Sequence, residues 1–299
     1  MRKPKVLLLG NGLLQTFNQQ SWRDFMESIT VREDLPEKLN CPNPLQMILR
    51  TNDTVGEKMK AKQKELRKVK LPDEVREMQK KLLTVGFDHI LTTNYSYELE
   101  ETAYPGIAQS DTRLRKITRC FRSEKVKQAE RKYLLHTYNE VLCEGVENKI
   151  WHIHGEARKP DSMVIGHYYY GNLLRKYQEV LKEKKNLYEI RQKNGELEEI
   201  NTWLDAFILG DIYVLGFGFD LSEFDLWWLL NRRKRERAKT GHIHFFQPEE
   251  SGFQEKDELL KLFDVEIHNC GFSKEQLDNQ YLPFYYAAID EICKMVRAE

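Results

Sequence analysis

Four short apolar runs, each closed by a glycine or an asparagine, most restrict what this chain can fold into. They are Val6–Leu9, Phe87–Thr93, Ile150–His154 and Ile212–Leu215. Apolar runs of this length are typical of strands buried on both faces of a parallel sheet. Two more strands are expected at His242–Phe246 and Val265–His268. Because helical patterns separate the strands, the sequence predicts an α/β, Rossmann-like parallel sheet with helices on both faces.

The chain of 299 residues is expected to form a single domain over 1–299. Its Rossmann-like core is assigned to about 1–57, 84–104, 148–170 and 205–299. Helical or irregular insertions, mainly helical overall, are expected at about 58–83, 105–147 and 171–204. Pro72 should divide the first insertion into two helices, and Gly171–Leu209 has a helical pattern. The charged helices could pack on the core or form an oligomer surface.

Composition and charge argue against several classes of protein. Lysine plus arginine and aspartate plus glutamate number 47 each, so binding to nucleic acid through bulk charge is not expected. A basic run from Arg232 to Arg235, with Arg237 and Lys239, leaves a nucleic-acid patch open, although such runs usually form a solvated face. No apolar stretch approaches the roughly 20 residues of a membrane-spanning helix.

The cysteines bear on compartment and on metal binding. Cys41, Cys120, Cys143, Cys270 and Cys293 are scattered and form no C-x-x-C pair. This spacing indicates neither a disulfide framework nor a zinc module, and no metal is expected. Scattered thiols suit a reducing compartment, so a cytoplasmic location is expected. The basic and apolar start of the chain is not typical of a signal peptide, because Gly10 interrupts it at once.

The first strand is followed by the turn Gly10-Asn11-Gly12-Leu13. Glycines at this place let a backbone approach a pyrophosphate. The third glycine of the dinucleotide motif is replaced by Gln15, so a plain strand-to-helix turn is an equally good interpretation.

The second strand closes with Thr92-Thr93-Asn94-Tyr95. An asparagine at the carboxyl end of a parallel strand lies where open α/β sheets bind ligands, and its amide both donates and accepts hydrogen bonds. A turn-forming asparagine is the alternative interpretation.

The third strand carries two histidines in Trp151-His152-Ile153-His154-Gly155. On a strand, His152 and His154 share one face. His154 stands at the strand end, where it could take a proton near neutral pH, whereas His152 is expected to be a packed core histidine. A structural role for His154 remains open.

The fourth strand ends in Gly216-Phe217-Gly218, and Asp225 follows near the start of a helix. The glycines permit close approach of a ligand. Asp225 is expected to favour the helix dipole as a carboxylate in the first turn.

In this order, the four blocks resemble the SIR2-like family, and most of all its bacterial branch with G-N-G-F, T-T-N-Y-D and H-I-H-G. The resemblance covers Lys5 to about Leu230. It implies that the chain binds NAD as substrate, with Asn94 and His154 catalytic. It further implies that the dinucleotide contacts the following residues: Gly10, Asn11, Gly12, Leu13, Thr93, Gly216, Phe217 and Gly218.

Two departures accompany this resemblance. Ser96 stands where the family has an aspartate after T-T-N-Y, and the four zinc-binding cysteines of the protein deacylases have no counterpart. The implied function is therefore an NAD⁺ hydrolase, of the kind that depletes NAD during phage infection, working as a homo-oligomer and with a separate sensor or activator protein. Alternatives are a protein deacylase or ADP-ribosyltransferase, and a silent module that binds a nucleotide or a partner.

Overall fold

A computed structural model describes most of the chain. The described residues are 3–18, 22–30, 32, 41–51, 62–121, 132–181, 192–193, 196–197, 201–236, 240–249, 254–273 and 281–298. Within them, no helix is long and apolar enough to cross a membrane. The five cysteines are free thiols.

The described strands form one large sheet and one short hairpin. The strands are β1 (Lys5–Leu9), β2 (His89–Thr92), β3 (Thr118–Cys120), β4 (Thr137–Cys143), β5 (Val146–His152), β6 (Gln192–Lys193), β7 (Glu196–Leu197), β8 (Asp211–Leu215), β9 (Ile243–Glu249) and β10 (Val265–Ser273). The eight-stranded sheet has the order β10-β9-β8-β1-β2-β5-β4-β3, and β6 pairs with β7. From β10 to β5 every pairing is parallel, whereas β4 runs antiparallel to β5 and to β3. The open, mostly parallel sheet confirms the predicted Rossmann-like class.

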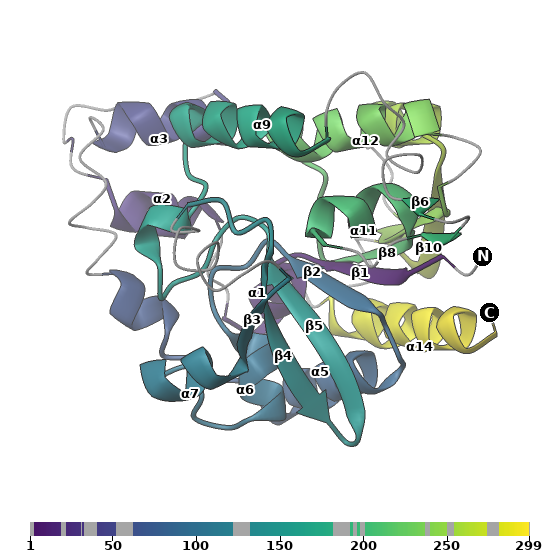
Figure 1. Ribbon diagram of the computed structural model, residues 1–299, viewed down its shortest axis with the longest axis horizontal. Helices are drawn as coiled ribbons and strands as arrows, with labels where there is room; N and C mark the ends of the chain where they lie inside the picture. Colours follow the sequence, from purple (N-terminus) through teal and green to yellow (C-terminus); the bar gives the residue numbers. More distant parts are fainter. Residues whose placement is uncertain are drawn as a thin grey trace.

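Helices cover both faces of this sheet (Figure 1). They are α1 (Gly12–Asn18), α2 (Trp22–Ser28), α3 (Asn43–Thr51), α5 (Asp73–Thr84), α6 (Glu98–Ala103), α7 (Asp111–Ile117), α9 (His167–Leu181), α11 (Trp203–Leu209), α12 (Phe224–Glu236), α13 (Gln254–Leu262) and α14 (Leu282–Ala298), with a short 3₁₀ turn at Pro160–Ser162. Helices α9, α11 and α12 lie on one side of the sheet, and α5 and α14 lie on the other (Figure 1).

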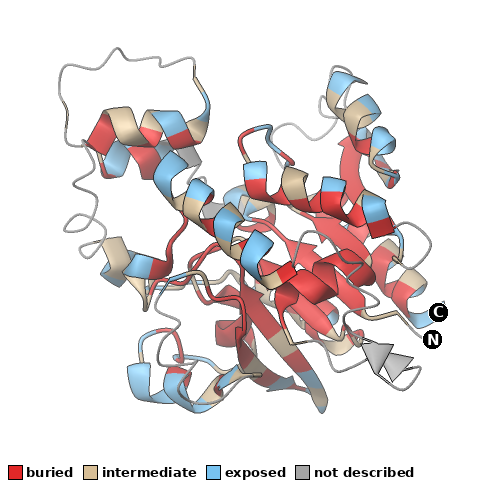
Figure 2. Cartoon of the chain, turned by 45° about the horizontal axis from the view of Figure 1, so that its top comes forward, coloured by how far each residue is buried: buried red, intermediate tan, exposed pale blue. Residues whose placement is uncertain are grey.

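The central strand β1 shows why the fold has two cores. Val6 and Leu8 belong to the core that α9, α11 and α12 complete, whereas Leu7 and Leu9 belong to the core beneath α5 and α14. All four side chains are buried, and Figure 2 shows the strands of the sheet coloured mainly as buried. Since each fully buried leucine or valine contributes about 1.5–3 kcal/mol, an apolar run without alternation is stable only in the middle of such a sandwich.

The boundaries of several elements differ from the prediction. The helix after Pro72 begins as expected at Asp73, and residues 62–66 are helical before it. The helical pattern of 171–209 is interrupted, because α9 ends at Leu181, the β6–β7 hairpin follows, and α11 begins only at Trp203. The charged helices α5 and α9 both pack an apolar stripe on the core.

The expected insertion at 105–147 contributes strands as well as a helix. It carries α7, and its strands β3 and β4 extend the main sheet beyond β5. Antiparallel strands at the edge of a parallel sheet are common in α/β proteins.

The basic run of α12 is partly buried. Arg233 is inside the protein and donates to backbone carbonyls at the end of α11, with Phe207 O at 2.6 Å and Gly210 O at 2.8 Å. Arg232 is also buried and pairs with Glu236 at 3.1 Å. These two arginines therefore stabilise the fold, and Arg237 and Lys239 lie outside the described residues.

Candidate functional site

The strand order creates a crevice beside β1. Strand β1 has β2 on one side and β8 on the other, and the connections leaving β1 and β8 include α5 on one face and α12 on the opposite face. At such a switch point open α/β sheets bind ligands, outside the carboxyl ends of the strands. A cavity of about 550 Å³ lies here. Its volume is in the range of small-molecule sites.

Every one of the four sequence blocks contributes to the cavity wall. The predicted residues that line it are Asn11, Gly12, Thr93, Asn94, His154, Gly216, Phe217 and Gly218. They follow the strands β1, β2, β5 and β8, which are neighbours in the sheet. Gly10 and Leu13 do not line the cavity, and Leu13 points its side chain into the core beneath α14.

The cavity is elongated because it crosses several strand ends. It reaches from Gln247 at the end of β9 to His154 after β5, which are four strand spacings apart. At about 4.8 Å per spacing, this is roughly 19 Å. One end is walled by Phe25, Met47 and Ile165, and the other by Phe245 and Phe246. An elongated ligand with an apolar group at each end would match this shape.

The glycines of the floor allow two turns to pack closely. The amide of Gly10 donates to Leu215 O at 3.0 Å, and that of Gly12 donates to Gly216 O at 2.8 Å. A Cβ on Gly10 would stand only 2.3 Å from the carbonyl oxygen of Gly216, and Gly216 itself has φ +64°. These glycines are therefore required to join the ends of β1 and β8.

Asn94 is held through its backbone, which leaves its side chain at the cavity wall. Its amide N–H donates to Thr92 Oγ1 at 3.1 Å, and its carbonyl accepts from His152 Nδ1 at 2.9 Å. The side-chain Nδ2 has a long contact of 3.5 Å to Gly10 O. The side chain of Asn94 is thus positioned next to the turn after β1 and is only weakly engaged there.

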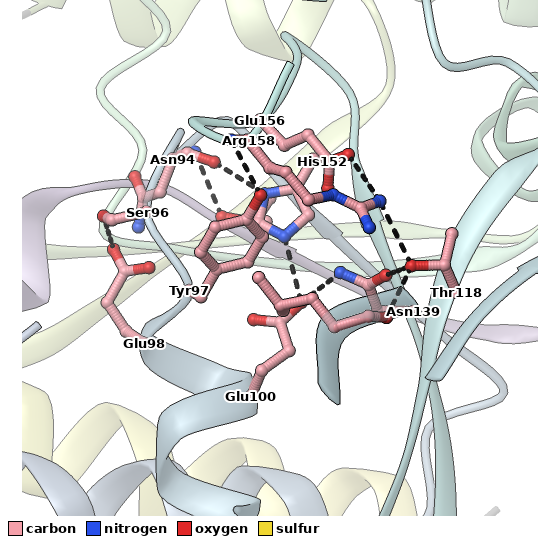
Figure 3. A network of polar contacts seen from close by, with 12 residues as sticks. Asn94, Ser96, Tyr97, Glu98, Glu100, Thr118, Asn139, His152, Glu156 and Arg158 are labelled. Carbon is pink, nitrogen blue, oxygen red and sulfur yellow. Dashed lines mark hydrogen bonds and ion pairs between the residues drawn. The ribbon is translucent and has the colours of Figure 1, made fainter. Parts of the chain in front are cut away.

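His152 belongs to a buried polar network behind the cavity (Figure 3). Its Nε2 lies 3.0 Å from Glu100 Oε1, and Glu100 also accepts from Asn139 Nδ2 at 2.8 Å. Burial lowers the pKa of His152, but Glu100, together with Glu156 and the Asn94 carbonyl, outweighs burial and raises the pKa to about 9. His152 is buried as expected for a core histidine, and in addition it fixes the backbone of Asn94.

His154 points to different partners. Strand β5 ends at His152, so the alternation of a strand does not extend to His154, and the two histidines contact different helices. His154 Nε2 lies 3.0 Å from Asp225 Oδ2, and its Nδ1 lies 3.9 Å from Glu223 Oε2. The expectation that His152 and His154 share one face is therefore wrong.

Asp225 is the principal residue that the sequence analysis did not assign to the site. It is fully buried in the first turn of α12, where it accepts from His154 and, at 3.0 Å, from the hydroxyl of Tyr177 in α9. Glu223 accepts from Tyr170 at 2.8 Å. The position of Asp225 after Gly216–Gly218 indicated only a favourable helix start. Its contact with His154 depends on how α12 packs in the folded chain, beside α9 and α11.

The carboxylates control the protonation of His154. Burial alone lowers the pKa of His154, but Asp225 and then Glu223 outweigh burial and raise the pKa to about 9. Burial raises the pKa of Glu223, although His154 opposes this. Without ligand, His154 is therefore an imidazolium at neutral pH, and it becomes a base only as the pH approaches 9.

Ser96 also lines the cavity, at the position where the resemblance leads one to expect an aspartate. Its hydroxyl donates to Glu98 Oε1 at 2.7 Å. Glu98 is buried, and burial raises the pKa of its carboxyl. A carboxyl group thus lies one hydrogen bond behind the cavity wall.

Protein-family models and curated proteins were both compared with this chain, and neither comparison found a match.

Proposed function

We propose that this protein is an NAD⁺ hydrolase that cleaves the bond between nicotinamide and ribose. The observation that carries the proposal is the joint presence of Asn94 and His154 in one cavity at the switch point of the sheet, with the buried Asp225 paired to His154. An amide that binds hydroxyls and a histidine oriented by a carboxylate are the groups that this cleavage needs.

The shape of the cavity supports one orientation of the bound dinucleotide. The nicotinamide ribose would lie between Asn94 and His154, with the nicotinamide ring toward Phe25 and Met47. The adenosine end would lie near Gly216–Gly218 and Phe245. The diphosphate would then cross the turn at Asn11, where the glycine backbone permits close approach.

The proposed reaction consumes one water. The glycosidic bond breaks with its electron pair leaving on nicotinamide, and a water oxygen bonds to the ribose carbon. The products are nicotinamide, ADP-ribose and one proton. His154 takes a proton from a ribose hydroxyl or from the water, and Asp225 stabilises the imidazolium that results. Asn94 holds the ribose or the attacking water.

The test is incubation of the purified protein with NAD⁺, followed by chromatography of nicotinamide and ADP-ribose. We expect release of both products in equal amounts, and loss of release in His154→Ala and Asn94→Ala. Asn172→Ala, a matched amide substitution on α9 away from the cavity, should keep the activity of the wild type. Binding of NAD⁺ without any release would contradict a hydrolase and favour a silent binding module.

The SIR2-like resemblance supports a biological role for this activity, namely depletion of NAD during phage infection. The corresponding test measures cellular NAD in bacteria that express the protein and are challenged with phage. NAD should fall with the wild-type protein and stay constant with His154→Ala. An equal loss of NAD in both cultures would contradict this role.

A further inference from the structure

A second cluster of ionisable side chains lies on the last two strands of the sheet, away from the cavity. His244 is the second residue of β9, and Glu266 is the second residue of β10, directly opposite it in the parallel register. His268 is two residues further along β10 and therefore shares the face of Glu266. The cavity lies at the carboxyl ends of the strands, whereas His244 and Glu266 lie near the amino ends.

The ligating atoms of these three side chains converge on one point. His244 Nδ1 is 3.1 Å from His268 Nε2 and 3.1 Å from Glu266 Oε2. One atom from each of the three side chains lies within 4.8 Å of the others. Two nitrogens bound to one tetrahedral zinc at about 2.05 Å are about 3.3 Å apart. The separations observed here are close to those of a formed metal site.

The surroundings of His268 supply an independent indication. Its Nε2 faces His244, and its other ring nitrogen, Nδ1, lies 3.1 Å from Glu291 Oε1 of α14. A histidine that binds a metal nearly always donates its second ring N–H to a carboxylate or a carbonyl, which orients the ring. The other oxygen of Glu291 is 3.7 Å from Cys270 Sγ, so Glu291 is itself held in place.

We infer that His244, His268 and Glu266 bind a divalent transition-metal ion of the zinc class. Two imidazoles and one carboxylate select zinc, cobalt or nickel over magnesium and calcium, which prefer oxygen ligands throughout. The ion ties the edge strand β10 to β9 and, through Glu291, to α14. Because Phe284 and Tyr285 at the start of α14 line the cavity, the ion also supports the back wall of the first site. This inference does not depend on the proposed NAD⁺ hydrolysis.

The experiment uses the full chain without an affinity tag, stripped with a chelator and titrated with Co²⁺ while visible absorption is recorded. We expect one Co²⁺ per chain with a spectrum of nitrogen and oxygen ligation, displaced by Zn²⁺. His268→Ala should weaken binding by about 100-fold or more, and Glu291→Gln by about 10–100-fold. Glu266→Gln changes a largely exposed side chain, so it tests the site with little effect on folding.

His154→Ala is the matched control, because His154, Glu223 and Asp225 form the other group of converging ligand atoms in the described part of the chain. This variant should bind Co²⁺ as the wild type does. Three results would overturn the inference: no saturable binding to the wild type, unchanged binding by folded Glu266→Gln and His268→Ala, or loss of binding in His154→Ala. Circular dichroism of every variant separates loss of ligand from loss of fold.

Discussion

Replacing Asp225 by asparagine tests the chemistry of the cavity most directly. Asp225 accepts from His154 at 3.0 Å, and it is the main reason that the pKa of His154 rises to about 9 despite burial. Asparagine has nearly the same shape but no charge. The substitution therefore removes the attraction that holds the proton on His154 and leaves the packing of α12 almost unchanged.

The expected magnitude follows from the two pKa values. With a pKa of about 9, about one His154 in a hundred is neutral at pH 7. If Asp225→Asn returns the pKa toward the ordinary value of about 6.5, roughly three quarters become neutral at that pH. The half-maximal point of the rising limb of kcat/KM should move from near pH 9 toward pH 6.5. The plateau should fall by two or more orders of magnitude, on the order of the loss in serine proteases, because no carboxylate stabilises the imidazolium.

The assay is kcat/KM for NAD⁺ cleavage from pH 5.5 to 9.5, which reports ionisation in the free enzyme, with a blank for alkaline breakdown of NAD⁺. NMR titration of His154 in the same protein gives the pKa without reference to activity. Glu100→Gln is the matched control, since Glu100 pairs with His152 at the same 3.0 Å distance but outside the cavity. In Glu100→Gln, the rising limb of the kcat/KM profile should stay near pH 9.

Three results would refute the reasoning. If NMR shows that the pKa of His154 is unchanged in Asp225→Asn, the carboxylate does not control its protonation. If the pKa moves but the rate profile does not, a group other than His154 provides the base. An effect of Glu100→Gln on the limb equal to that of Asp225→Asn would show that both buried pairs act only through the general charge of the core.

Three further outcomes are expected. Gly10→Ala should abolish NAD⁺ binding measured by calorimetry, because its Cβ would lie 2.3 Å from a carbonyl oxygen of the facing turn, whereas Gly171→Ala has no neighbour within 4 Å and should bind normally. Arg233→Ala should lower the free energy of unfolding in urea by at least about 3 kcal/mol, since buried carbonyls lose their donors, and exposed Arg235→Ala should change it little. The pKa of His152 is about 9 in the folded protein, above the unfolded value of about 6.5. Protonated His152 therefore stabilises the folded state fully below pH 6.5, and this stabilisation is lost toward pH 9. Thermal melts should show Tm falling over that window.

The strands and the turns that follow them could be predicted because their causes are local. The unbroken apolar residues of Val6–Leu9 have no stable place except a strand covered on both faces. The glycine at position 216 also has a local cause, since a backbone at φ +64° disfavours other residues. The location of Asn94 and His154 at strand ends, where parallel sheets collect ligand-binding groups, was likewise predictable, and both residues line the cavity.

Some predictions of helix boundaries and of exposed residues were wrong, and the reasons are equally physical. The charged stretch 171–209 has helical periodicity over most of its length, but α9 and α11 pack on the core as separate helices with a hairpin between them. The basic run of α12 looked solvated because a sequence pattern does not show which arginine meets buried carbonyls. Arg233 donates a hydrogen bond to a backbone carbonyl at the end of α11, which lies beside it only in the folded chain.

By itself, the sequence determined the parallel α/β class, the glycine turns and the edge of the sheet where the cavity lies. Only the tertiary structure decided which charged groups meet. Asp225 is 71 residues from His154, and Glu291 is 23 residues from His268. Local propensities act over a few residues, but the partner of a buried imidazole depends on strand order and helix packing. Since those partners shift its pKa, the protonation state of His154, and with it the chemistry of the cavity, belongs to the fold and not to any segment.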